Sequence, residues 1–261
     1  MSTDWLGTLR QDATGTFDPG RFSMARRPLG IGSLPTGSLA GGHPCCLDML
    51  VRLPDGEMTL PEPYRSHAGI QAFVQMCCEF EDDLVPRWRD THYAYLTVDH
   101  RIVRSGRPHR SGGWHFDGMQ GARYPVKIQA CHQYVVSDRL PTEFTDAVTD
   151  ASDLGELEHN WFEELGSQVN EAANVFAPHP LEIVAMSAYQ LHRSRIAKPE
   201  EEGWRTFLRL DFSLKQQDRL GNTINPDLPA PFEYVPRDLP EGIRRPVSDS
   251  GWESAVRFTA R

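Results

Sequence analysis

Apolar and polar residues alternate along several stretches of the chain, with the period of two that predicts β-strands. In residues 91–103, Ala94, Leu96 and Val98 fall at every second position and would share one face of a strand. Apolar runs predict further strands over residues 124–137, 180–194 and 204–214. The chain is therefore expected to be rich in β-structure.

A hairpin is predicted over residues 46–64. Two strand-like runs flank Pro54-Asp55-Gly56, which is a strong turn signal.

Helical periodicity is clear in two stretches only. Residues 66–85 have apolar side chains at helical spacing after a possible cap at Ser66, and residues 154–176 form a second amphipathic pattern. Residues 1–42 are rich in Gly, Pro, Ser and Arg and predict loops and short strands without a helix. The tail from Lys215 onward is rich in Pro, Asp and Arg and predicts extended chain.

The order of these elements indicates the fold class. Strands are not regularly interleaved with helices, which disfavours a Rossmann fold or a (β/α)8 barrel. We expect a mainly β fold with flanking helices, a double-stranded β-helix of the jelly-roll or cupin-like type. One domain over residues 1–261 is the simplest division, with a core at about residues 93–213 and extensions packing on it.

Composition and charge exclude some classes of function. A formal net charge of −9 makes a nucleic-acid duplex an unsuitable main partner. Neither an apolar run long enough to cross a membrane nor a secretory signal is evident. The five cysteines include two adjacent pairs, which suits packing in a reducing cytoplasm better than disulfides. A small molecule is the expected partner, and the oligomeric state stays open.

The segment GWHFDGMQG, residues 113–121, carries the first candidate chemistry. His115 and Asp117 are two residues apart, so on a strand they point to the same face and could grip one metal ion. His192, between an apolar strand and a polar loop, is the candidate third ligand. Two imidazoles and one carboxylate suit Fe(II) and leave coordination positions open. Each residue also has an ordinary interpretation, since Asp117 could be a turn residue and a strand-end histidine is commonly solvated.

Two arginines on the last predicted strand point to an anion. Arg205 and Arg209 are four apart and share one face with Phe207 between them. An inward guanidinium needs a negatively charged partner, which a dicarboxylate could supply through a bidentate contact. Arg205 could instead pair with the acidic residues 200–202 of the preceding loop.

The order HxD, long insert, apolar strand, His, short loop and Arg-bearing strand resembles the Fe(II)/2-oxoglutarate-dependent dioxygenase superfamily, of the phytanoyl or clavaminate-like small-molecule type. The resemblance implies Fe(II) on His115, Asp117 and His192, with 2-oxoglutarate and O2 as co-substrates. It implies that Arg205, or alternatively Arg209, binds the distal carboxylate of 2-oxoglutarate. Because Asp117 is present, hydroxylation, desaturation or ring closure is favoured over halogenation, with release of succinate and CO2.

A basic loop precedes the candidate metal motif. Arg104 and Arg107 lie in it, in an otherwise acidic chain, and could attract an anionic substrate, while Trp114 could form a wall of the same region. A solvated loop is the simpler interpretation. Two other functions stay open: a non-catalytic jelly-roll binding protein, and a cupin-type metal enzyme that uses no 2-oxoglutarate.

Overall fold

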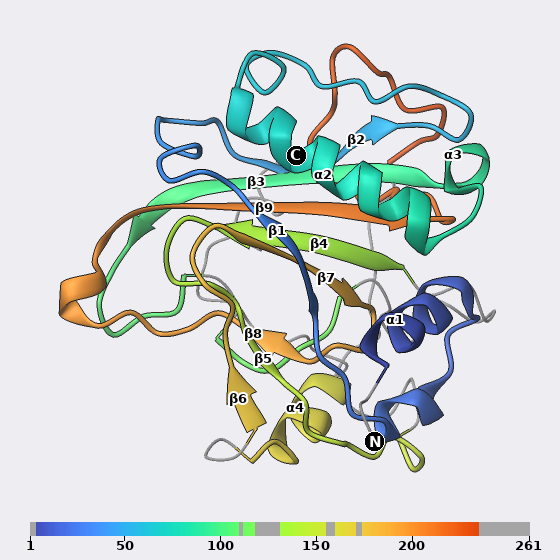
Figure 1. Cartoon of the computed structure of the whole chain (residues 1–261), viewed down its shortest axis with the longest axis vertical. Coiled ribbons are helices and arrows are strands. Elements are labelled where there is room, and N and C mark those ends of the chain that lie inside the picture. Colours follow the sequence, from blue (N-terminus) through green and yellow to red (C-terminus); the bar gives the residue numbers. More distant parts are fainter. Residues whose placement is uncertain (1–3, 110–111, 118–130, 155–159, 171–173, 235–261) are drawn as a thin grey trace.

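The computed structural model describes residues 4–109, 112–117, 131–154, 160–170 and 174–234, and in this part the chain forms two antiparallel sheets (Figure 1). The larger sheet has six strands in the order β1-β7-β4-β9-β3-β2, and the smaller has three in the order β6-β5-β8. The predicted mainly β, jelly-roll class is confirmed. No helix in the described ranges is both long enough and apolar enough to span a bilayer.

The elements follow one another along the chain with strands predominating. The strands are β1 (Leu29–Ser33), β2 (Cys46–Arg52), β3 (Tyr93–Val103), β4 (His132–Ser137), β5 (Glu143–Thr145), β6 (Val175–Phe176), β7 (Glu182–Ser187), β8 (His192–Arg193) and β9 (Gly203–Ser213). The helices are α1 (Trp5–Thr14), α2 (Ala68–Leu84), α3 (Trp88–Thr91) and α4 (Trp161–Ser167), with 3-10 turns at Pro19–Ser23 and Pro199–Glu201.

Helix α2 covers one face of the large sheet and forms the main core with it (Figure 1). The even-numbered residues of β9 point to this face, and Leu208, Leu210 and Phe212 are fully buried there. Ile70 and Phe73 of α2, also fully buried, belong to the same cluster. The helix was predicted, but its N-cap is His67, whose Nδ1 accepts from the amide of Ile70, rather than Ser66.

The opposite face of the large sheet is turned toward the small sheet and is partly polar. The odd-numbered residues of β9 point this way, and they include Arg205, Phe207, Arg209 and Asp211. Phe207 packs here with a second apolar cluster whose other buried members are Val135, Phe144, Val184 and Met186. This face is the interior of the jelly roll.

The predicted hairpin over residues 46–64 is wrong. The turn forms after Leu53, where the Gly56 amide donates to the Leu53 carbonyl. One backbone hydrogen bond returns to β2, from the Thr59 amide to the Val51 carbonyl at 2.7 Å, but no strand follows the turn and β2 forms its ladder with β3. Non-local pairing with β3 therefore replaces the local partner that the turn signal suggested.

The predicted strand over residues 180–194 is two strands in two sheets. β7 ends at Ser187, and β8 begins at His192 in the small sheet. Between them, Gln190 donates its amide to the Ser187 carbonyl in a turn. Ala188, Tyr189 and Leu191 of the connection are buried like strand residues, so the apolar pattern continues through the break and does not reveal it.

Two expectations about helices differ from the structure, one over residues 154–176 and one in residues 1–42. Within the predicted helix 154–176, α4 covers only Trp161–Ser167 and residues 175–176 form β6; residues 155–159 and 171–173 lie outside the described residues. Helix α1, which was not expected, is capped by Asp4, whose carboxylate accepts from the Gly7 amide. Residues 124–130 of the predicted strand 124–137 also lie outside the described residues.

Candidate metal centre

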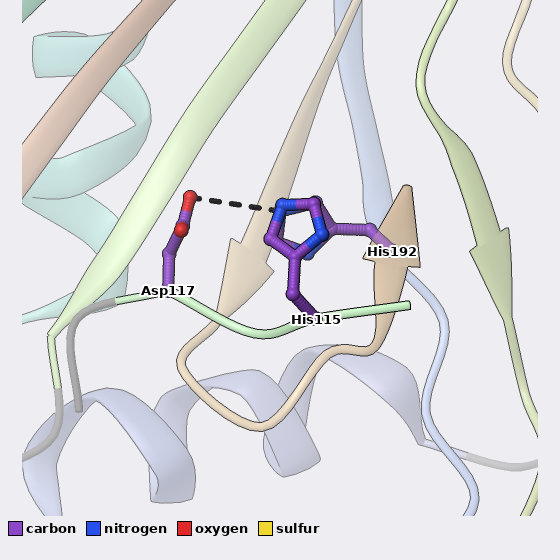
Figure 2. A group of neighbouring side chains, drawn as sticks. All are labelled: His115, Asp117 and His192. Atoms are coloured by element: carbon purple, nitrogen blue, oxygen red, sulfur yellow. Dashed lines mark ion pairs between the residues drawn. The ribbon is translucent and has the colours of Figure 1, made fainter. Parts of the chain in front are cut away.

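His115 and His192 are brought together by a direct backbone pairing. The amide of each donates to the carbonyl of the other, at 3.0 and 2.9 Å, in an isolated antiparallel bridge. Residues paired in this way project their side chains to the same side, and the two imidazole centroids are 4.4 Å apart (Figure 2). The bridge between β8 and the segment around His115 thus places two potential nitrogen ligands side by side from positions distant in sequence.

Asp117 completes the group from the same segment as His115. Figure 2 shows its carboxylate turned toward the two imidazoles, with Oδ2 3.5 Å from Nε2 of His192. The intervening Phe116 points into an aromatic core, where its ring lies 5.0 Å from those of both Phe22 and Phe162. Because side chains alternate along this extended segment, Phe116 packs in the core while His115 and Asp117 point toward the site.

Hydrogen bonds fix both imidazoles in the same tautomer. Nδ1 of His115 lies 2.8 Å from the Gly113 carbonyl, and Nδ1 of His192 lies 2.9 Å from the Gln190 carbonyl. A carbonyl oxygen can only accept, so Nδ1 carries the proton in each neutral ring and Nε2 presents a lone pair. Such contacts also hold the orientation of metal-binding histidines.

The three side chains meet the basic geometric requirement for one metal ion. Their potential ligand atoms all lie within 4.8 Å of one another, and no other group of three His, Cys, Asp or Glu in the described ranges does so. Two neutral nitrogens and one carboxylate oxygen form a donor set that fits Fe(II).

Arg209 provides the positive charge beside this carboxylate. Its Nη1 lies 2.6 Å from Oδ2 of Asp117. Burial by itself would raise the pKa of Asp117, but the Arg209 guanidinium outweighs it and holds that pKa well below the ordinary value. Asp117 is therefore an anion at neutral pH, as a metal ligand must be.

Two further carboxylates share Arg209. Asp48 of β2 lies 2.5 Å from Nη2, and Asp211 of β9 lies 2.9 Å from Nε. Burial, opposed by Arg209 and reinforced by Asp48 and Asp117, raises the pKa of Asp211 to about 7. Neither residue was predicted from the sequence. Alternation along β9 could have identified Asp211, whereas nothing in the sequence linked Asp48 to Arg209.

Arg205 lies on the same interior face as Arg209, in a different environment. Its side chain is buried, its Nε donates to the carbonyls of Arg139 and Leu140 at 3.0 and 3.1 Å, and its guanidinium lies over the Phe207 ring. The loop carboxylates offered as alternative partners have other contacts: Glu201 pairs with Arg195, and Glu202 accepts from the Ser105 amide.

The remaining candidate residues are placed differently. Arg104 and Arg107 are exposed in the loop after β3. Trp114 is buried in the aromatic core, and the guanidinium of Arg193 lies 4.4 Å from its ring centroid. His132 of β4 faces α2 on the other side of the sheet and lies 2.8 Å from Glu81.

No protein-family model and no curated protein matches the chain. Among solved structures, EvdO2 from Micromonospora carbonacea var. aurantiaca is similar at 11% identity and a TM-score of 0.33, covering 53% of this chain and 64% of that one. The chain thus spans less than two thirds of EvdO2. The non-heme monooxygenase ThoJ is similar at 13% identity and a TM-score of 0.38, covering 76% of this chain and 75% of that one. An oxidoreductase of the 2OG-Fe(II) oxygenase family from Burkholderia pseudomallei is similar at 12% identity and a TM-score of 0.37, covering 85% and 93%.

Proposed function

We propose that this chain is a non-haem Fe(II)- and 2-oxoglutarate-dependent oxygenase that hydroxylates, desaturates or cyclises a small molecule. The observation that carries the proposal is the convergence of His115, Asp117 and His192, with both histidines presenting Nε2. Bound Fe(II) and 2-oxoglutarate would supply the oxidation, in which O2 is activated as 2-oxoglutarate is converted to succinate and CO2.

The chain's own residues hold and orient the participants. His115 and His192 would bind the metal through Nε2, and Asp117 through its carboxylate, on one side of the ion. Three protein ligands would leave coordination positions of such an ion for exchangeable ligands. The aromatic core around Phe116 supports the segment that carries two of the three ligands and limits water around it.

Arg205 is the better candidate for the distal carboxylate of 2-oxoglutarate. It lies on the same interior face of the large sheet as Arg209, and its Nε donates to the carbonyls of Arg139 and Leu140. Arg209, by contrast, has three carboxylates within 2.9 Å. A fourth carboxylate there would add negative charge to a site that already holds more anions than cations.

A metal-binding and turnover experiment tests the proposal. Wild-type protein should bind one Mn(II) per chain, and with Fe(II), ascorbate and O2 it should form succinate from 2-oxoglutarate. His192→Ala and Asp117→Ala should lose both properties, while the exposed His179→Ala serves as the matched control. Full Mn(II) binding and turnover in His192→Ala would show that the ligands are misassigned.

The co-substrate is tested through Arg205. Removal of one partner of a buried charged pair costs about 2–5 kcal/mol, so Arg205→Leu should weaken 2-oxoglutarate binding at least tenfold. Calorimetry on the Mn(II)-loaded protein measures the change in 2-oxoglutarate affinity. Arg205→Lys keeps the charge but not the planar fork, so its affinity should lie between those of the wild type and Arg205→Leu. Mn(II) binding without any 2-oxoglutarate affinity would favour a cupin-type metal enzyme, and no Mn(II) binding would favour a non-catalytic binding protein.

A further inference from the structure

Three carboxylates surround the Arg209 guanidinium, which donates hydrogen bonds to two of them through Nη1 and Nη2 and forms an ion pair with the third. Nη1 lies 2.6 Å from Asp117, Nη2 lies 2.5 Å from Asp48, and Nε lies 2.9 Å from Asp211. The Arg209 side chain is 10% exposed, so water screens these contacts weakly. One cation therefore joins β2, β9 and the segment that carries two candidate metal ligands.

Asp48 is held in place by contacts within the large sheet. Asp48 adopts a left-handed backbone conformation, with a φ of 44°, where the pairing of β2 with β3 is irregular. Its amide donates to Oγ1 of Thr97 at 3.1 Å, and that hydroxyl lies 3.2 Å from the Asp48 carboxylate. Thr97 is the direct cross-strand partner of Arg209. The backbone bulge and the strand register together direct the Asp48 carboxylate at the guanidinium.

The position of the Asp117 carboxylate depends on side-chain contacts. Asp117 belongs to no regular strand, and its carboxylate contacts Arg209 and His192 through the same oxygen, Oδ2. Arg209 thus connects a ligand on an irregular segment to two carboxylates on the sheet.

We propose that Arg209 is a positioning residue that holds the Asp117 carboxylate in place for the metal, with Asp48 and Asp211 fixing Arg209 in turn. The inference rests on the proposed function, since it gives Arg209 a task at the same metal centre. It assigns Arg209 to the ligand and not to the co-substrate. Groups that orient a metal ligand in this way typically change metal affinity 10- to 100-fold when removed.

The sign of the effect separates positioning from simple electrostatics. Removing Arg209 makes the site more negative by one charge, which by Coulomb attraction alone would strengthen the binding of a divalent cation. Loss of positioning weakens it. A fall in affinity on removal of a positive charge is therefore specific to the proposed role.

The experiment compares Mn(II) affinity among wild-type, Arg209→Gln, Arg209→Lys and Arg27→Gln proteins, with free Mn(II) measured by electron paramagnetic resonance. Arg27 is the matched control, because it also pairs with a carboxylate, Asp146, at 2.6 Å, outside the site. We expect Arg209→Gln to bind Mn(II) about 10- to 100-fold more weakly. Arg209→Lys should be intermediate, because an ammonium cannot reproduce the two directed hydrogen bonds of the guanidinium, and Arg27→Gln should match the wild type.

A second variant guards against misfolding. Asp48→Asn keeps Arg209 and all three candidate ligands but removes one of the carboxylates that fix Arg209, and should also weaken Mn(II) binding. Because this change removes a negative charge, only Arg209→Gln separates positioning from electrostatics. Thermal unfolding of each metal-free protein reports its integrity. Unchanged or tighter Mn(II) binding by Arg209→Gln or Asp48→Asn, in a wild-type background that binds one Mn(II), would overturn the inference and leave the proposed function standing. Absence of stoichiometric Mn(II) binding by the wild type would overturn the proposed function itself.

Discussion

His92 should make the protein lose stability in mild acid. The residue follows α3, its side chain is buried, and its ring centroid lies 6.0 Å from that of His132. Burial, reinforced by His132 and opposed by Glu81, lowers the pKa of His92 from 6.5 to about 4. The folded protein therefore resists protonation of a group that the unfolded chain protonates readily.

The sign and size of the effect follow from proton linkage. Between about pH 6.5 and pH 4 the unfolded chain binds a proton at His92 that the folded protein does not, so the free energy of unfolding falls as the pH falls. The loss is about 2 kcal/mol from pH 7 to pH 5, and about 3 kcal/mol once the pH is below 4. For a protein of ordinary stability this is a large fraction of the total.

Urea unfolding of the wild type and His92→Gln at several pH values between about 7 and 5 measures the effect. Glutamine retains a polar group near Oγ1 of Thr91, which lies 2.9 Å from Nδ1 of His92, and does not titrate. Burial also lowers the pKa of His43 and His109, but their contributions are common to both proteins and cancel in the difference. If His92→Gln loses as much stability as the wild type on acidification, the low pKa is not the source of the acid sensitivity.

Three further predictions concern the loop, the core and the metal motif. Arg104→Ala and Arg107→Ala should weaken the stimulation of succinate formation by an anionic substrate at low salt and leave Mn(II) binding unchanged; equal stimulation in all three proteins would identify a solvated connection. Gly69→Ala should lower the free energy of unfolding by about 1–3 kcal/mol in urea, because the added Cβ would lie 2.0 Å from the Ser38 carbonyl oxygen. Phe116→Ala should cost about 3–5 kcal/mol in the same assay and also weaken Mn(II) binding, whereas a loss of stability alone would show that the ligands do not depend on the aromatic core.

The three candidate ligands lie where local sequence patterns predicted them. The spacing of His115 and Asp117 predicted a shared side, and the structure places both side chains there with Phe116 turned away. His192 was selected because it ends an apolar run, and it lies opposite His115. Local alternation carries this information because the two-residue period of an extended chain fixes which side chains share a face.

The sequence by itself determined the elements with strong local patterns. The period-two strand at 91–103, the Arg-bearing strand at 204–214 and the amphipathic helix at 66–85 correspond to β3, β9 and α2 within a few residues. The mainly β class followed from their order. These features depend on the spacing of apolar residues that are close together in the chain, and a single sequence shows that spacing directly.

Only the tertiary structure decided which elements meet. It paired β2 with β3 instead of closing a hairpin, divided the 180–194 run between two sheets, and brought Asp48 within 2.5 Å of Arg209. Asp48 and Arg209 are 161 positions apart, and a contact over such a separation leaves no periodic pattern in a single sequence. Many distant residues could satisfy the same burial or ion pairing, so the fold decides which one does. The candidate metal ligands could be inferred from local spacing, whereas the carboxylates around Arg209 could be identified only from the three-dimensional structure.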